Sequence, residues 1–226
     1  MHSENLPFEE LTLRGADRPA RVRRGVDPAR LMDITGALLV LVFLAPLMVM
    51  IVGLILVVDR APPIFGHARI GRGGRTFKCL KFRSMRVNAD ELLRAHLARD
   101  DEARACWERQ HKLLRDPRIT PLGSLLRRSS LDELPQLFNV LRGDMSLVGP
   151  RPIVRAEIAK YGRYFVHYCR VRPGITGLWQ VSGRSDTSYR RRVALDVTYV
   201  KFRTFWLDLR ILALTLPAVI LQKGSQ

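Results

Sequence analysis

The longest uninterrupted apolar run in the chain most restricts what it can fold into. From Ile34 to Val58 the sequence reads ITGALLVLVFLAPLMVMIVGLILVV, 25 residues without a charge. A helix needs roughly 20 such residues to cross a bilayer, so the run predicts a membrane segment. Both the run and the Arg-rich leader before it are too long for a cleaved signal peptide, so we expect the segment to remain as an anchor.

Pro46 lies near the middle of this segment, where its ring and missing N–H kink or break a helix. Arginines flank the segment on both sides: Arg18, Arg21, Arg23, Arg24 and Arg30 before it, and Arg60, Arg69, Arg72 and Arg75 after it. The positive-inside rule places such residues in the cytoplasm. A helix that bends at Ala45-Pro46 and returns satisfies both flanks, whereas a kinked spanning helix satisfies one. Both courses remain open from the pattern alone.

The formal net charge of +17 is large for 226 residues and implies anionic partners. Nucleic acid, an anionic lipid surface and phosphorylated substrates all fit the charge. A nucleic-acid module would interleave aromatic side chains with basic ones, but aromatic residues make up 8 % of the chain and no such module is recognisable. Three cysteines without a Cys-x-x-Cys spacing argue against a zinc site and a disulfide framework. The membrane segment therefore favours lipid and phosphate.

Patterning elsewhere predicts a mostly helical α/β (α+β) fold. Residues 64–85 read as two short strands around a glycine turn, and Gly177 and Gly183 bound a short strand, LWQVS. Helices are expected at 88–114, 131–141, 153–165, 188–202 and 205–221. The charge-free part of the last helix is too short to span a membrane, so we expect an interfacial or core helix.

The stretch Ser129–Pro152, SSLDELPQLFNVLRGDMSLVGPRP, holds the densest polar signal. Asp132 and Glu133 are adjacent carboxylates, arginines precede them, and Gly149 and Arg151 follow. Phosphoryl transfer needs a nucleophile or base, a carboxylate for Mg²⁺ and cations on the phosphate oxygens. Glycines let backbone N–H groups approach those oxygens. The stretch therefore predicts a phosphoryl-transfer site.

A purely structural role is the alternative for the two acids. Ser130-x-x-Glu133 matches a capping box, and acids in a first turn favour the helix dipole. Spacing alone favours the capping role. The two roles are compatible, because one carboxylate can cap a helix while its neighbour faces a pocket.

A series of short motifs follows along the chain. They are Lys81-Phe82-Arg83-Ser84-Met85, Asp116-Pro117-Arg118, Leu131-Asp132-Glu133-Leu134-Pro135-Gln136, Asn139-Val140-Leu141, Gly143-Asp144-Met145-Ser146, Gly149-Pro150-Arg151-Pro152, Arg172-Pro173-Gly174-Ile175-Thr176-Gly177 and Gln180-Val181-x-Gly183-Arg184. In this order and spacing the chain resembles the bacterial sugar transferases, also called monotopic phosphoglycosyl transferases. The resemblance runs from about Asp33 to Leu221.

The resemblance implies a role for each acid. Asp132 would be the nucleophile that attacks the β-phosphorus of a UDP-sugar, forming an aspartyl-phosphosugar and releasing UMP. Glu133 would hold Mg²⁺. Polyprenyl phosphate would then attack the intermediate, so that one difficult transfer is divided into two steps.

The resemblance also implies basic substrate-binding residues. Arg127 resembles the family's phosphate-contacting arginine, and Arg151 and Arg184 would contact phosphate or the uracil side. Lys81 and Arg83 would bind either substrate or anionic headgroups, and both roles remain open. The run Arg190-Arg191-Arg192 is expected on a solvated or headgroup-facing side of its helix.

An organisation follows from the same resemblance. Residues 1–31 would be a basic tail, 32–60 a re-entrant membrane helix broken at Pro46, and 61–226 a cytosolic catalytic domain with an interfacial C-terminal helix. The family breaks its helix at a Ser-Pro pair, where this chain has Ala45-Pro46. The protein would lie at the cytoplasmic face of the bacterial inner membrane and use a UDP-sugar, undecaprenyl phosphate and anionic lipids. A homodimer is left open.

The stretch Tyr199–Leu221 resembles larger family members that begin exopolysaccharide or O-antigen units with galactose or glucose 1-phosphate. We therefore expect an unmodified hexose, with galactose ahead of glucose and an N-acetylated sugar as the alternative. A non-enzymatic basic membrane scaffold is a further alternative, and it would leave Asp132 and Glu133 without a task.

Overall fold

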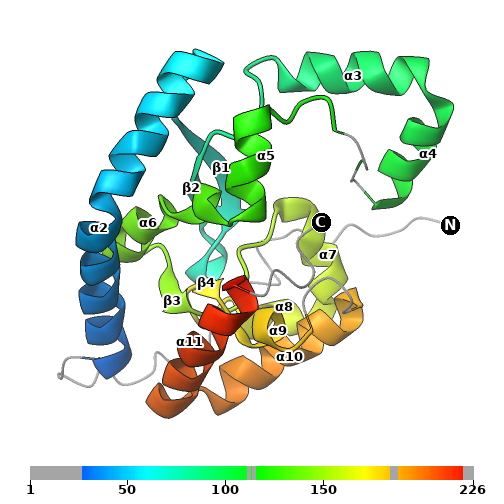
Figure 1. The fold of residues 1–226 in the computed structure, drawn as a ribbon. Helices are drawn as coiled ribbons and strands as arrows, with labels where there is room; N and C mark the ends of the chain where they lie inside the picture. The colour runs from blue at the N-terminus through cyan, green and yellow to red at the C-terminus, as the bar shows by residue number, and fades with distance from the viewer. Residues whose placement is uncertain (1–26, 111–112, 114–115, 184–187, 221–226) are drawn as a thin grey trace, which may run out of the picture.

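The computed structural model describes residues 27–110, 113, 116–183 and 188–220 (Figure 1). The helices are α2 Pro28–Leu54, α3 Ala89–Arg99, α4 Asp101–Gln110, α5 Pro121–Arg128, α6 Gln136–Arg142, α7 Ile158–Tyr161, α8 Phe165–Tyr168, α9 Leu178–Val181, α10 Tyr189–Phe202 and α11 Phe205–Ile220. The strands are β1 Ile64–Ile70, β2 Thr76–Phe82, β3 Ser146–Val148 and β4 Gly174–Thr176. β1 pairs antiparallel with β2, and β3 pairs parallel with β4. The mostly helical α+β fold is confirmed.

Helix α2 lies along one side of the molecule and continues into a π-helical turn, Ile55–Asp59. Asp27 caps its start, since the Asp27 side chain accepts a hydrogen bond from the Ala29 N–H. Pro28 in the first turn needs no partner there, because helix starts leave N–H groups unpaired. Within the described residues, this is the one helix long and apolar enough to cross a membrane.

The structure differs from the predicted break at Pro46. Pro46 lies inside α2, which stays helical from Pro28 to Leu54. Figure 1 shows the helix bent rather than interrupted. A proline removes one backbone hydrogen bond, but its φ is helical and the turns on either side keep their own bonds. The re-entrant course remains a prediction.

Helix α2 has one buried stripe and one exposed apolar face. Ala37, Met48, Ile51 and Ile55 recur at helical spacing and pack against residues of β2, α5 and α6. The opposite face carries large apolar side chains, and Phe43 is 82 % exposed. The helix is therefore part of the core on one side and suited to lipid on the other.

Polar contacts fix the first turns of α2 to the rest of the molecule. The buried carboxylate of Asp33 accepts hydrogen bonds from Ser146 Oγ and from the Leu147 N–H, both at 2.8 Å. Arg30 donates to two carbonyls in the last turn of α6, those of Val140 at 2.7 Å and Leu141 at 3.0 Å. Helix C-termini leave such carbonyls unpaired. The first turns of α2 thereby supply hydrogen-bond partners to backbone groups of α6 and β3.

Several local predictions are confirmed and two are wrong. The β1–β2 hairpin turns through Gly73, whose φ of 68° favours glycine, and α10 and α11 form where expected. The helix expected at 88–114 is instead two, because Asp100 leaves the helical region and its side chain caps Ala103. LWQVS forms the helical turn α9 rather than a strand, and it packs on α10 and α11 with Trp179 buried.

Candidate active site

The two adjacent acids lie on a tight turn between α5 and α6. Leu131–Glu133 forms one 3-10 turn, entered through Ser130 at a φ of 57°. A residue other than glycine in this left-handed region is strained. Ser130 makes no side-chain cap, and the Glu133 carboxylate bonds elsewhere. The predicted capping box is therefore wrong, and the turn presents its acids to strand β2.

Lys81 of β2 binds both carboxylates. Its Nζ donates to Glu133 Oε1 at 2.6 Å and lies 3.6 Å from Asp132 Oδ2. Burial alone would raise the pKa of Glu133, but the charges of Lys81 and Arg151 outweigh it and lower that pKa. Burial raises the pKa of Asp132, with Lys81 opposing part of the shift. The two carboxyls thus have distinct protonation behaviour, although they are neighbours in sequence.

Arg127 of α5 lies close to the acids because the backbone of α5 approaches the segment just after β2. The Nε of Arg127 donates to Ser84 Oγ at 2.8 Å, and its charge opposes the rise in the pKa of Asp132. A Cβ at Gly123 would lie 2.0 Å from the Ser84 carbonyl oxygen. Only glycine lets α5 approach the end of β2 this closely, so Gly123 sets the place of Arg127.

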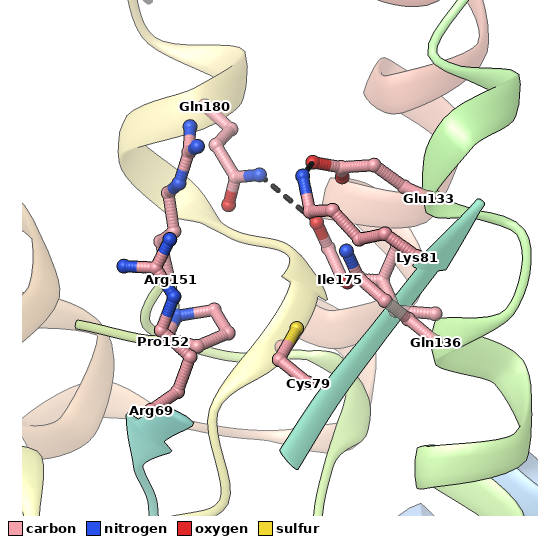
Figure 2. A pocket seen from close by; sticks show the side chains of 10 residues that line it. Arg69, Cys79, Lys81, Glu133, Gln136, Arg151, Pro152, Ile175 and Gln180 are labelled. Atoms are coloured by element: carbon pink, nitrogen blue, oxygen red, sulfur yellow. Dashed lines mark hydrogen bonds and ion pairs between the residues drawn. The ribbon is translucent and has the colours of Figure 1, made fainter. Parts of the chain in front are cut away.

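A small cavity of about 20 Å³ lies beside Glu133, and Figure 2 shows the side chains that line it. It is lined by Arg69, Cys79, Lys81, Glu133, Gln136, Arg151, Pro152, Gly174, Ile175 and Gln180. Arg69 and Arg151 lie on one side of it, opposite Lys81, Glu133 and Gln136. Three cationic groups thus surround a space that one carboxylate borders, a charge arrangement that attracts phosphate oxygens.

The β3–β4 crossing holds Arg151 over this cavity. A Cβ on Gly174 would lie 2.1 Å from the Gly149 nitrogen, and a Cβ on Gly177 would lie 2.2 Å from the Gly149 oxygen. Backbone bonds join the segments, from Gly149 N–H to Thr176 O at 2.8 Å and from Gly174 N–H to Pro150 O at 2.9 Å. Gly149, Gly174 and Gly177 therefore permit a close approach of the two backbone segments. Arg151 comes two residues after Gly149, so this approach fixes where Arg151 lies.

The structure brings together most of the predicted site residues. Lys81, Glu133 and Arg151 line the cavity, while Asp132 and Arg127 lie beside it. Arg83 is directed elsewhere: its Nε donates to Pro62 O at 2.7 Å and its guanidinium lies over the Phe65 ring. The prediction for Arg184 lies outside the described residues.

The sequence suggested no catalytic or substrate-binding role for Arg69, Cys79, Gln136 or Gln180, although all four line the cavity. Gln180 donates to Ile175 O at 2.9 Å, and its buried Oε1 has no hydrogen-bond partner among the described residues. A buried acceptor of this kind is costly unless a donor binds to it. The available signal was the alternation along β2, which places Cys79 on the same face as Lys81.

The donor set fits Mg²⁺ bound together with substrate. Within the described residues no group of three or more His, Cys, Asp or Glu side chains could hold a metal by itself. Mg²⁺ commonly takes one or two carboxylates and completes its shell with substrate phosphates and water. Glu133 supplies one such carboxylate, and it has the lowered pKa that a ligand needs.

The family match and the similar proteins point to the same family. Residues 27–222 match the sequence pattern of the family described as bacterial sugar transferase. The chain is 50 % identical over 196 residues to the "UDP-galactose-lipid carrier transferase" of Erwinia amylovora, which covers 87 % of this chain and 41 % of the relative. It is 47 % identical over 211 residues to the "Exopolysaccharide production protein ExoY" of Sinorhizobium fredii, which covers 93 % and 92 %.

A glucose-specific name occurs among the relatives as well. The "UDP-glucose:undecaprenyl-phosphate glucose-1-phosphate transferase" of Xanthomonas campestris pv. campestris is 41 % identical over 203 residues, covering 86 % of this chain and 39 % of the relative. The chain thus spans about two fifths of the length of the Erwinia and Xanthomonas proteins, and nearly all of ExoY.

Proposed function

Because the chain belongs to the bacterial sugar transferase family, we propose that it transfers a hexose 1-phosphate from a UDP-hexose to undecaprenyl phosphate. The reaction would be the first membrane step of exopolysaccharide synthesis. One observation carries the proposal: Lys81 holds two adjacent carboxylates, 2.6 and 3.6 Å away, at a cavity lined by arginines. A scaffold would have no need of such a grouping.

In the first step an Asp132 carboxylate oxygen attacks the β-phosphorus of the donor. The bond from that phosphorus to the bridging oxygen breaks, and UMP leaves with this oxygen. An oxygen of undecaprenyl phosphate then attacks the same phosphorus. The bond to Asp132 breaks, the carboxylate is restored, and the product is a lipid diphosphate sugar.

The other residues position and neutralise. When bound at Glu133, Mg²⁺ supplies charge neutralisation on the phosphate oxygens. Lys81 keeps Glu133 ionised and directs a positive charge at Asp132. Arg151 and Arg69 bind phosphate oxygens from the opposite side of the cavity, and Arg127 stabilises the ionised form of Asp132. The open Gln180 Oε1 accepts a hydrogen bond from a donor hydroxyl or the uracil ring.

The membrane helix sets where the reaction occurs. Basic residues flank the apolar segment of α2 on both sides, which supports a re-entrant course with the catalytic residues on the cytoplasmic face. There the soluble donor and the lipid acceptor meet at one surface. The names and identities of the relatives support galactose ahead of glucose as the sugar.

The decisive test is UMP release by purified full-length protein with Mg²⁺, undecaprenyl phosphate and a panel of UDP-sugars. UDP-galactose or UDP-glucose should release UMP, and mass spectrometry of the quenched reaction without acceptor should find a hexose phosphate on Asp132. Asp132→Asn should abolish both signals, whereas Asp90→Asn on the exposed start of α3 should change neither. Preference for UDP-N-acetylhexosamines would replace the sugar assignment, and absence of the adduct would refute the mechanism.

A further inference from the structure

A second, larger hollow lies next to the candidate active site and shares none of its lining residues. We refer to it as the hairpin hollow, and it measures about 530 Å³. It is lined by Gly71, Arg72, Gly73, Arg75, Thr76, Phe77, Gly143, Asp144 and Arg172. These residues come from the turn of the β1–β2 hairpin, the corner between α6 and β3, and the segment before β4.

Three arginines face this hollow with little negative charge to balance them. Within the described residues, Arg72, Arg75 and Arg172 form no ion pair with a carboxylate. Asp144 is the one acid among the nine lining residues, and its Oδ2 already accepts from the Asn139 amide at 3.2 Å. Burial and then the charges of Arg30 and Arg72 lower the pKa of Arg172, against smaller opposing contributions from Asp33 and Asp27. Positive groups crowded in this way favour an added anion.

Hydrogen bonds hold the residues that line the hollow in place. Arg172 lines the hollow, and its Nε donates to the Gly143 carbonyl at 2.8 Å. The Gly71 N–H donates to Arg75 O and the Gly73 N–H donates to Cys169 O. These two backbone donors are therefore used, and the three guanidinium groups offer planar donors that suit phosphate oxygens.

The hollow lies beside the first turn of α2, close to where the apolar segment begins. Gly143 lines it, and a Cβ on Gly143 would lie 3.6 Å from the Arg30 guanidinium on the first turn of α2. Four residues beyond Arg30, Ile34 starts the charge-free run. A group bound here therefore lies near the headgroup layer, where arginines attract anionic lipids.

We propose that the hairpin hollow binds the phosphate of an anionic membrane lipid through Arg72, Arg75 and Arg172. The site is distinct from the candidate active site, although neighbouring residues of the same segments line both: Arg69 and Gly71, Cys79 and Phe77, Gly174 and Arg172. A lipid held here fixes the height of the molecule at the membrane surface and brings lipid phosphate close to the reaction cavity.

The test measures lipid binding by full-length protein in a neutral detergent, with native mass spectrometry counting bound short-chain phosphatidylglycerol. Phosphatidylcholine, which has no net charge, is the comparison lipid. The Arg72→Gln/Arg75→Gln variant changes two exposed side chains and should bind phosphatidylglycerol about 30-fold more weakly, at roughly fivefold per arginine. The control Arg86→Gln/Arg99→Gln removes the same charge from exposed positions outside the hollow and should bind as the parent does.

Competition identifies the source of the phosphate. Neither inorganic phosphate nor UMP should displace the lipid at equal concentration. Displacement that depends on Arg72 and Arg75 would assign the hollow to a soluble phosphate and overturn the lipid proposal, as would equal affinity of the two double variants. Asp132→Asn should retain full lipid binding, so failure of the transfer reaction and failure of this site are separately visible.

Discussion

Lys81 Nζ lies 2.6 Å from Glu133 Oε1 and so joins strand β2 to the turn before α6, 52 residues further along the chain. Through this contact the β1–β2 hairpin lies directly beside Asp132 and Glu133. Of the two roles left open for Lys81, the contact favours the proposed one at the substrate, because the ammonium lies at the acids.

Lys81→Met should lower the rate of UMP release by about 10²-fold, the usual scale for loss of one electrostatic contact at a reacting centre. The methionine keeps the length of the side chain but removes the charge that lowers the pKa of Glu133. Steady-state kinetics with increasing Mg²⁺ would measure it. Lys78→Met, an exposed residue of the same strand, should retain activity, and equal losses in the two variants would contradict the role of Lys81.

Gly174→Ala should destabilise the protein by about 3 kcal/mol or more, at the upper end of overpacking costs. The new methyl group would lie 2.1 Å from the Gly149 nitrogen and 2.4 Å from the Thr176 oxygen, and backbone cannot rotate away as a side chain can. Thermal unfolding in detergent measures the loss. The matched change Gly66→Ala meets its nearest atom at an ordinary 3.4 Å and should leave the melting temperature nearly unaltered.

Asp33→Ala should cost about 2–4 kcal/mol, because it leaves the Leu147 N–H without its acceptor and Arg30 without its nearby acid, 3.9 Å away. The same unfolding measurement applies. Thr35→Ala, on the exposed face of the same helix, serves as the reference and should shift stability only slightly. A loss no larger than that of the reference would show that α2 does not depend on this anchor.

Asp196 should give a pH dependence of stability. Burial raises its pKa to about 6 from an ordinary 3.8, while Tyr161 donates to its Oδ2 at 2.6 Å. Between these values the folded state keeps a proton that the unfolded state has released, so stability falls as pH rises from about 4 to about 6. The contribution is about 3 kcal/mol at most.

Asp196→Asn keeps an acceptor for Tyr161 and should lose this slope. Melting temperatures of parent and variant, recorded from pH 4 to pH 7, should diverge as pH rises, with the variant becoming relatively more stable. Parallel curves would show that Asp196 ionises normally in the folded protein.

Local chemistry explains which parts of the fold could be predicted. The glycine turn of residues 72–74 and the capped helix after Ser188 depend on neighbours in sequence, and both appear where expected. The strand predicted for LWQVS is wrong because five residues carry too little periodicity, and the packing of α9 against α10 and α11 decides its form.

The candidate site likewise has features that the sequence predicts and features that it cannot predict. The adjacency of Asp132 and Glu133 is visible in the sequence, and their motif resembles that of the family. Their relation to Lys81 and to Arg69 depends on a turn meeting a strand far away in sequence, which spacing cannot supply. The predicted capping box is wrong for the same reason. The ammonium of Lys81, distant in sequence, binds the Glu133 carboxylate more strongly than a nearby backbone N–H does.

The buried stripe of α2 has a practical consequence for anyone who wishes to handle this enzyme in water. Removing α2 would expose buried side chains that pack against it, among them Cys79, Phe82 and Val140, and exposed apolar patches promote aggregation. A cut version should aggregate instead of dissolving. We therefore expect α2 to be needed for folding as well as for the proposed membrane attachment, so that detergent or lipid belongs in every preparation.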